Sequence, residues 1–232
     1  MNTKRVFDLA ILVLFAPIWL PLMVVLVCLV RLRLGSPVFF QQQRPGLRGA
    51  IFKMVKFRTM TDGRNLAGHL LPDAERLTSF GNWLRTTSMD ELPELWNVLC
   101  GQMSLVGPRP LMVHYLQRYT PEQNRRHEVI PGITGWAQIN GRNNISWSDR
   151  FRLDVWYVDN RSTWLDTQIL FWTLVKVLQR RDINAAGSAT MPEFNPGACP
   201  ISLITMPASP APSLTVSSIT QRSLSSKARA SA

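Results

Sequence analysis

The stretch "LFAPIWLPL", residues 14–22, sets the architecture of this chain, because it places two prolines inside the one membrane-length apolar run of the sequence. The run extends from Leu9 to Val30 without a charge, and a helix needs about 20 apolar residues to cross the hydrocarbon of a bilayer. Each proline lacks a backbone N–H and clashes with the carbonyl one turn earlier. Pro17 and Pro21 therefore predict a bend where a simple spanning helix would be straight.

The charges on either side of the run favour one side of the membrane. Two basic residues precede the run, and two follow it directly, where a signal peptide would have a small-residue cleavage site. These residues are Lys4, Arg5, Arg31 and Arg33. By the positive-inside rule both ends belong in the cytoplasm. We therefore expect a re-entrant helix-break-helix that turns near Ala16-Pro17, with Pro21 sharing the bend. A kinked spanning helix is the alternative, because membrane helices tolerate proline.

Composition narrows the classes of protein. The chain of 232 residues has a formal charge of 26 − 15 = +11, which favours anionic partners such as lipid headgroups, nucleotide phosphates or nucleic acid. The three cysteines lack C-x-x-C spacing and the three histidines lack metal-ligand spacing, so we expect a reducing compartment, no disulfide and no zinc site. P-loop, G-x-G-x-x-G, G-x-S-x-G and H-E-x-x-H motifs are missing from the sequence, which disfavours common nucleotide and hydrolase sites.

Beyond the apolar run the patterns predict a small unit, mainly α with a minor β-hairpin. "SPVFFQQQ" and "IFKMVKFRTM", joined by the turn-like "RPGLRG", predict the hairpin. Apolar spacing predicts helices over 73–84 and 164–181, and the second either lies flat in the headgroup region or belongs to the core. From about Pro196 the chain is rich in Ser, Pro and Ala and predicts a disordered tail.

The segment "RTTSMDELPELWNVLCGQMSLVGPRP", residues 85–110, holds the strongest candidate site. A helical stripe ends before Gly101, and Ser88 with Glu91 matches the S-x-x-E capping box, so Asp90 and Glu91 are expected in the first turn of a helix. Acidic residues there complement the helix dipole without any catalytic role, which is the simpler interpretation. The same geometry keeps a carboxylate ionised, as a nucleophile or a hard-metal ligand must be. With an arginine and Mg²⁺, the two carboxylates could handle a diphosphate.

Four basic residues are candidates for phosphate binding. Lys56 lies in the second strand of the expected hairpin, where a solvated strand edge is the alternative. Arg85 precedes the acidic pair, and Arg109 lies between two prolines in "GPRP". Arg142 lies in "PGITGWAQINGRNNISW", residues 131–147, whose amides and tryptophans suit a nucleotide or a sugar but also fit an ordinary polar loop.

Taken together, these motifs resemble the bacterial sugar transferases, or monotopic phosphoglycosyl transferases, most closely the small PglC type. The resemblance runs from about Lys4 to Asn195 and rests on ordered motifs: "KRVFD", "RPG" with "FKMVKFRTM", "SMDELPELWNVLCGQMSLVGPRP", "RRHEVIPGITGWAQINGRN" with "ISW" and "LDVWYV", and "ATMPEF". It implies transfer of a sugar-1-phosphate, from a UDP-sugar that is N-acetylated in the closest type, to undecaprenyl phosphate, with release of UMP and a requirement for Mg²⁺. The implied fold is α+β, with a re-entrant membrane helix, a small helical cytosolic domain, interfacial amphipathic helices and a minor β-hairpin.

The resemblance also implies roles residue by residue. Asp90 matches the family's aspartate nucleophile, which attacks the sugar-linked phosphorus and holds a phosphosugar intermediate. Glu91 matches its acidic neighbour, which helps with the metal or with deprotonating the lipid phosphate, so both carboxylates are implied as metal ligands. Four basic positions look like phosphate or nucleotide contacts, and these are Lys56, Arg85, Arg109 and Arg142. One departure concerns the membrane break, where the family often has Ser-Pro and this chain has Ala16-Pro17.

The implied setting is the bacterial inner membrane, with an anchor over 1–33, a catalytic domain over 34–195 facing the cytoplasm, and a tail over 196–232. The product would start an exopolysaccharide, an O-antigen or a glycoprotein glycan and pass to downstream glycosyltransferases. Membrane lipid is an expected partner and nucleic acid is not, since no nucleic-acid module is visible. The sequence leaves a homo-oligomer open. The alternative function is a non-catalytic, membrane-anchored basic protein that binds anionic lipid or nucleic acid.

Overall fold

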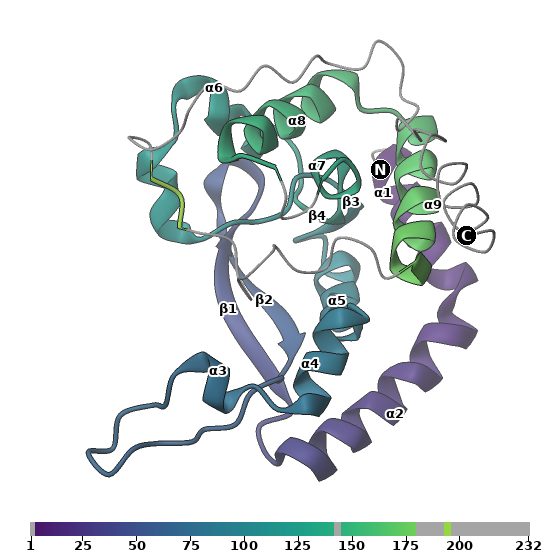
Figure 1. Ribbon diagram of the computed structural model, residues 1–232. Helices are drawn as coiled ribbons and strands as arrows, with labels where there is room; N and C mark the ends of the chain where they lie inside the picture. Colours follow the sequence, from purple (N-terminus) through teal and green to yellow (C-terminus); the bar gives the residue numbers. More distant parts are fainter. Residues whose placement is uncertain (1–2, 142–144, 180–192, 196–232) are drawn as a thin grey trace, which may run out of the picture. The chain divides into compact units, whose positions relative to one another are not determined.

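The computed structural model describes residues 3–141, 145–179 and 193–195 (Figure 1). These residues are mainly helical with a small β part, which confirms the predicted fold class. The elements are α1 (Thr3–Leu14), α2 (Ala16–Leu34), β1 (Phe39–Pro45), η1 (Leu47–Gly49), β2 (Ile51–Phe57), α3 (Asp73–Arg76), α4 (Ser79–Thr86), η2 (Met89–Glu91), α5 (Glu94–Leu99), β3 (Ser104–Val106), η3 (Val113–Arg118), α6 (Pro121–Asn124), η4 (Arg125–Glu128), β4 (Gly132–Thr134), α7 (Trp136–Ile139), α8 (Trp147–Asn160) and α9 (Thr163–Gln179). The predicted tail over 196–232 lies outside the described residues.

The apolar run is interrupted between α1 and α2. α1 ends at Leu14 and α2 begins at Ala16, and Pro17 lies in the first turn of α2, where a missing N–H costs no hydrogen bond. The indole Nε1 of Trp19 donates a 2.9 Å hydrogen bond to the carbonyl of Leu12, a group that the interruption leaves without its helical partner. The helix is therefore interrupted next to Ala16-Pro17, where the break was predicted, and the re-entrant turn in a membrane stays a prediction.

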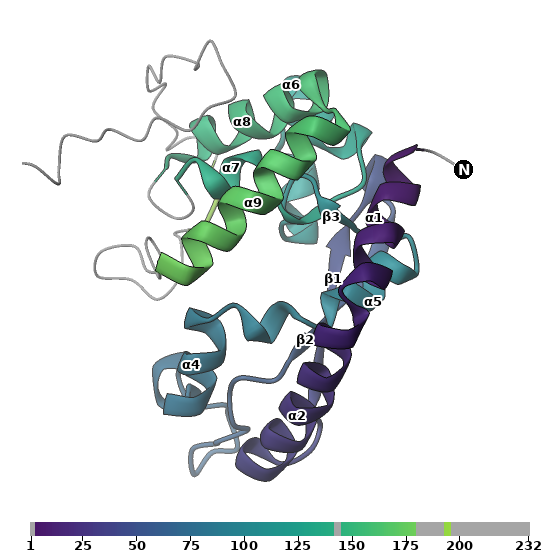
Figure 2. The ribbon, with the colours of Figure 1, turned by 90° about the vertical axis from the view of Figure 1, so that its right-hand side faces the viewer.

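Pro21 lies inside α2, which continues through it to Leu34. Pro21 therefore does not interrupt the helix, but a missing hydrogen bond can bend a helix without ending it, so a bend shared by Pro21 stays a prediction. Figure 2 shows α2 beside the hairpin and α4, where its buried residues Leu26 and Val30 share a cluster with Phe57. The opposite face exposes apolar side chains, namely Ile18, Leu20, Val24, Val25 and Leu32. Among the described helices, α2 alone is long and apolar enough to cross a membrane.

β1 and β2 form the predicted hairpin. The strands are antiparallel, with Phe39 opposite Phe57 and Pro45 opposite Ile51, and η1 closes the turn. A second β unit, the parallel pair of β3 and β4, places Ser104 beside Gly132. This pair was not predicted, because strands of three residues are too short to show a period. The pairing of β3 with β4 places "GPRP", which follows β3, beside the "PGITG" segment that contains β4.

The helix predicted over 73–84 is two helices, α3 and α4. The Thr78 hydroxyl accepts a 3.0 Å hydrogen bond from the N–H of Gly81 and so caps the start of α4. A Cβ on Gly81 would lie 1.8 Å from the carbonyl oxygen of Thr59, so the glycine allows α4 to approach the end of the hairpin closely.

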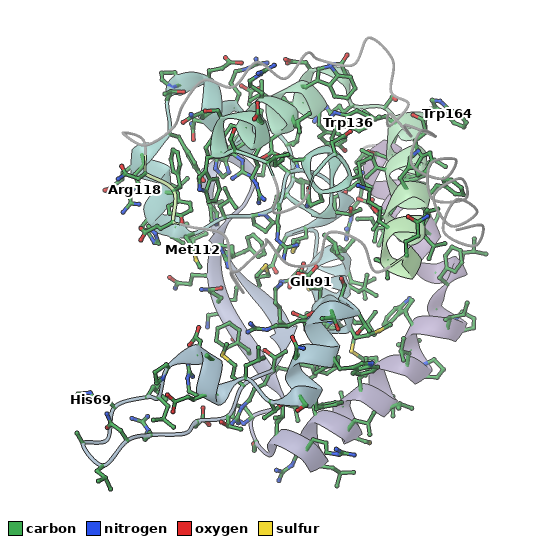
Figure 3. The ribbon with its side chains drawn as sticks, viewed as in Figure 1. His69, Glu91, Met112, Arg118, Trp136 and Trp164 are labelled. Carbon is green, nitrogen blue, oxygen red and sulfur yellow. The ribbon has the colours of Figure 1, made fainter. Side chains whose placement is uncertain are left out.

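The main core joins α1, β2, α5, β3, α7, α8 and α9 around the fully buried indole of Trp136 (Figure 3). α9 confirms the helix predicted over 164–181 as far as Gln179, and the last two residues lie outside the described residues. It contributes Leu165 and Ile169 to this core, while Trp164, Phe171 and Leu174 are exposed.

Two basic residues of α1 bind this helix to the same core through hydrogen bonds and an ion pair. Arg5 on α1 donates to the carbonyl of Leu99 at 2.6 Å and also to that of Val98, which caps the end of α5. Lys4 Nζ lies 2.7 Å from a carboxylate oxygen of Asp166 on α9. α1 is thus attached directly to α5, the helix that follows the acidic pair.

Candidate active site

The acidic pair lies in the short 3₁₀ turn η2. Ser88 has a positive φ of 57° and makes no side-chain capping bond, so the predicted capping box is wrong. α5 begins only after Pro93, because a proline fits at the start of a helix but not in its interior. The turn packs against β2 and α4, and this packing buries Asp90 and leaves Glu91 half-buried.

Glu91, which is labelled in Figure 3, holds two cations in place. Lys56 Nζ donates to Glu91 Oε1 at 2.7 Å, and Arg109 donates through Nη2 to the same oxygen and through Nη1 to Oε2 at 3.3 Å. Lys56 Nζ also lies 3.1 Å from Oε1 of Glu94, which is buried. The structure therefore brings Lys56, Arg109 and Glu91 together and adds Glu94, whose regular helical position gave no functional signal in the sequence.

Asp90 differs from its neighbour. Its carboxylate accepts no hydrogen bond and forms no ion pair with any side chain of the described residues. The residue is 9% exposed, and its oxygens are not among the completely enclosed ones. Asp90 is thus a nearly buried carboxylate that keeps some access and has no fixed partner.

The local charges separate the three carboxyl groups. Burial, reinforced by the negative charge of Glu91, raises the pKa of Asp90 from 3.8 to about 6. Burial also raises the pKa of Glu94 from 4.5 to about 7. For Glu91 burial acts in the same direction, but Arg109 and Lys56 outweigh it and hold the pKa well below its ordinary value. We expected a helix N-terminus to favour ionisation of Asp90; instead its pKa is raised, although the group is still mostly ionised at neutral pH.

Neighbouring side chains fix this arrangement. Buried Asn97 accepts from the N–H of Val55 at 3.0 Å and donates to the carbonyl of Lys53 at 2.8 Å, which holds β2, and with it Lys56, against α5. Buried Arg126 donates at 2.7 Å to the carbonyl of Arg109 and so fixes the backbone of "GPRP".

A cavity of about 330 Å³ lies beside the acidic pair. Its lining residues are Arg85, Ser88, Glu91, Leu92, Leu95, Arg109, Ile133, Thr134, Gln138, Ile139, Arg150, Thr173, Lys176 and Val177. Asp90 lies between two lining residues, Ser88 and Glu91, but does not line the cavity itself. Arg85 is oriented by a 3.0 Å hydrogen bond from its Nε to the hydroxyl of Thr59. The cavity therefore combines basic side chains with apolar walls.

Two basic lining residues, Arg150 on α8 and Lys176 on α9, were not predicted. Neither belongs to a motif, and only the packing of α8 and α9 brings them to the cavity. For Lys176 the sole available signal was its position on a mostly apolar helix, whereas Arg150 lies on a helix with several other charged residues and gave no signal. Arg142, which was predicted to bind phosphate, lies outside the described residues.

The carboxylates can be tested against the implied Mg²⁺. The described residues contain no group of three or more metal-ligating side chains. Mg²⁺ is, however, usually held by one or two carboxylates together with substrate phosphates and water. Asp90 has no competing partner among the described side chains, whereas both oxygens of Glu91 are engaged by cations. The donor set fits a Mg²⁺ shared with a phosphate ligand, with Asp90 as the carboxylate whose oxygens no cation of the described residues occupies.

Comparison with known proteins shows the family. A family model described as bacterial sugar transferase matches residues 1–180. The chain belongs to the bacterial sugar transferases. This confirms, at the level of the family, the resemblance carried by the motifs.

Individual relatives of this sugar transferase differ in how much they share with it. It is 54% identical over 194 residues to an uncharacterized sugar transferase, EpsL, of Bacillus subtilis, which covers 84% of this chain and 96% of that protein. It is 39% identical over 196 residues to an undecaprenyl-phosphate galactose phosphotransferase of Salmonella typhimurium, covering 77% of this chain but 41% of that protein. It is 38% identical over 183 residues to a UDP-glucose:undecaprenyl-phosphate glucose-1-phosphate transferase of Escherichia coli, covering 75% of this chain but 39% of that protein. The chain thus spans about two fifths of these two relatives with named substrates.

Proposed function

We propose that this sugar transferase moves a sugar-1-phosphate from a UDP-sugar to undecaprenyl phosphate and releases UMP. The single observation that carries the proposal is Asp90, a carboxylate without a fixed partner, next to a cavity lined by arginines. The named substrates of the two relatives from Salmonella typhimurium and Escherichia coli support the same reaction class.

In the first step, an oxygen of Asp90 attacks the sugar-linked phosphorus. The bond from this phosphorus to the oxygen that bridges the two phosphates breaks, and UMP leaves with the electron pair. Asp90 then carries a phosphosugar as an acyl phosphate. A pKa of about 6 suits this task, because the carboxylate is ionised at neutral pH yet remains more basic than an ordinary aspartate.

In the second step, a phosphate oxygen of undecaprenyl phosphate attacks the same phosphorus. The bond to Asp90 breaks, the diphosphate-linked sugar lipid leaves, and the carboxylate is restored. Both steps need charge neutralisation more than elaborate covalent machinery. Arg85 and Arg109 supply positive charge on the cavity wall, and Lys56 keeps Glu91 ionised beside Asp90. When bound, Mg²⁺ would add charge neutralisation at the diphosphate, with Asp90 and Glu91 as its candidate ligands.

Which sugar is transferred follows from small contacts. The resemblance to the small type favours an N-acetylated sugar, whereas the relatives with named substrates act on galactose and glucose. A panel of N-acetylated and plain UDP-hexoses with undecaprenyl phosphate, monitored by UMP release, tests the proposal and identifies the sugar. UMP release that depends on the lipid phosphate supports a transferase; no release from any UDP-sugar, with lipid binding retained, would favour the non-catalytic binding protein.

The membrane arrangement is part of the proposal. The break at Ala16-Pro17 and the exposed apolar face of α2 support a re-entrant anchor in the inner membrane, with the catalytic domain on the cytoplasmic side. Undecaprenyl phosphate keeps its phosphate at the interface, so a catalyst fastened to such an anchor has access to it. A cysteine placed at Asn2 is expected to resist labelling from the periplasm, and strong periplasmic labelling would favour the spanning helix.

A further inference from the structure

The cavity contains a polar side chain that the reaction steps above do not use. Gln138 on α7 lines the cavity, and both its Oε1 and its Nε2 are buried without a hydrogen-bond partner among the described residues. A buried carboxamide with neither group paired is costly, and such groups in native proteins usually have an explanation. A ligand that supplies both partners would explain this one.

Two neighbouring polar groups on the same wall are already satisfied. The hydroxyl of Thr173 donates to the carbonyl of Ile169 at 2.7 Å, so the 2.7 Å contact between Thr173 Oγ1 and Thr134 Oγ1 must use the proton of Thr134. Gln138 differs from this pair because neither its Oε1 nor its Nε2 has a hydrogen-bond partner among the described residues, although the residue lines the same cavity.

The backbone holds Gln138 close to the arginine-bearing loop. The N–H of Gly107, two residues before Arg109, donates at 2.8 Å to the carbonyl of Thr134. A Cβ on Gly135 would lie 2.2 Å from the carbonyl oxygen of Gly107 and 2.7 Å from Gln138 Oε1. This hydrogen bond and the close approach at Gly135 fix α7 against "GPRP", so Gln138 and Arg109 line one cavity in a fixed arrangement.

We infer that Gln138 binds the imide edge of the uracil ring of the donor, an assignment that rests on the proposed function. Oε1 accepts from the ring N3–H, and Nε2 donates to the adjacent ring carbonyl. A carboxamide pairs through both groups with a base edge that offers the complementary donor and acceptor side by side. Apolar wall residues such as Ile133 and Ile139 suit the faces of a flat ring, and Arg85 and Arg109 suit the phosphates that follow it.

The test measures UMP binding, without turnover, by calorimetric titration of the full chain in detergent. Gln138→Leu keeps the size of the side chain and removes both groups, so we expect UMP to bind about tenfold more weakly, as for the loss of a bidentate base contact. Gln168→Leu is the matched control: Gln168 on α9 also has a buried, unpaired Oε1 but does not line the cavity, so UMP binding is expected to be unchanged.

A second probe, UMP methylated at N3, cannot donate to Gln138. It should bind the unmodified protein about tenfold more weakly than UMP but bind Gln138→Leu as UMP does. Unchanged UMP affinity in Gln138→Leu would overturn the inference. If the KM for the UDP-sugar rises while UMP affinity stays unchanged, Gln138 contacts the sugar instead. If the variant does not fold, equal affinity of the unmodified protein for UMP and its N3-methyl form overturns it. Failure of the proposed function is distinct, since it would appear as UMP binding without sugar-phosphate transfer.

Discussion

Arg109 binds both carboxylate oxygens of Glu91, and this ion pair gives Glu91 a different role from the adjacent Asp90. Glu91 is committed to holding Arg109 and Lys56, whereas its neighbour Asp90 has no fixed partner among the described side chains. Two carboxylates that follow each other in the chain thus acquire different tasks from their surroundings.

Glu91→Gln should change the pH profile as well as the rate. The negative charge of Glu91 contributes to the raised pKa of Asp90, so its removal lowers that pKa below about 6. The acid limb of kcat, which reports ionisation of Asp90, is expected to move to lower pH, while kcat at its plateau falls about tenfold or more because two cations lose their common partner. The measurement is kcat against pH, with Glu122→Gln, an exposed glutamate paired with Arg125, as control. An acid limb that stays in place would contradict the coupling.

Asp90→Asn should stabilise the protein above neutral pH. Because the folded pKa of about 6 exceeds the unfolded value of 3.8, the folded state keeps its proton longer, and stability falls as pH rises between these values. The asparagine variant escapes this loss, so its advantage at pH 8 is about 2–3 kcal/mol and disappears towards pH 4. Thermal unfolding at several pH values measures it, with the exposed Asp62→Asn as control. A variant that is less stable at pH 8 would indicate a purely structural role for Asp90.

Asn97→Ala should destabilise the domain and disturb the site together. Loss of the buried amide leaves the N–H of Val55 and the carbonyl of Lys53 without partners, at a cost of about 3 kcal/mol. β2 is then free to shift, and Lys56 loses its position beside Glu91. We expect a lower Tm and slower UMP release, whereas Asn82→Ala, at an exposed position on α4, changes neither. Full activity in Asn97→Ala would show that Lys56 is positioned by other contacts.

Trp19→Phe should weaken the break between α1 and α2. The indole supplies the hydrogen bond to the carbonyl of Leu12, in a segment with few other donors, and its loss costs about 1–3 kcal/mol. The expected result is a lower aggregation temperature in detergent. Trp164→Phe, an exposed tryptophan on α9, is the control and should behave like the unmodified protein. If the two variants behave alike, Trp19 does not stabilise the break between α1 and α2.

Much of the architecture was predictable from sequence, and the exceptions have physical reasons. Pro17 marked the interruption between α1 and α2 because proline acts locally, whereas Pro21 lies inside α2, which continues through it. Ser88 and Glu91 matched a capping pattern, yet Pro93 delays the start of α5 and turns the acids into a 3₁₀ segment.

The candidate site, too, was predicted from the sequence only in part. Lys56, Glu91 and Arg109 were predicted because each lies in a distinctive motif, and the fold brings them together. Glu94 and Arg150 were missed because they occupy ordinary helical positions, and Gln138 was not singled out among the amides of residues 131–147. Their significance comes from burial and from the three-dimensional meeting of separate helices, which no local pattern encodes.

The most direct test of the account is the covalent state of Asp90. The protein is incubated with UDP-sugar and Mg²⁺ but without undecaprenyl phosphate, then digested and analysed by mass spectrometry. The account predicts one UMP released per active chain and a sugar phosphate on the peptide that contains Asp90, with neither in Asp90→Asn. UMP released only when the lipid phosphate is present, with no adduct on Asp90 under any condition, would contradict it.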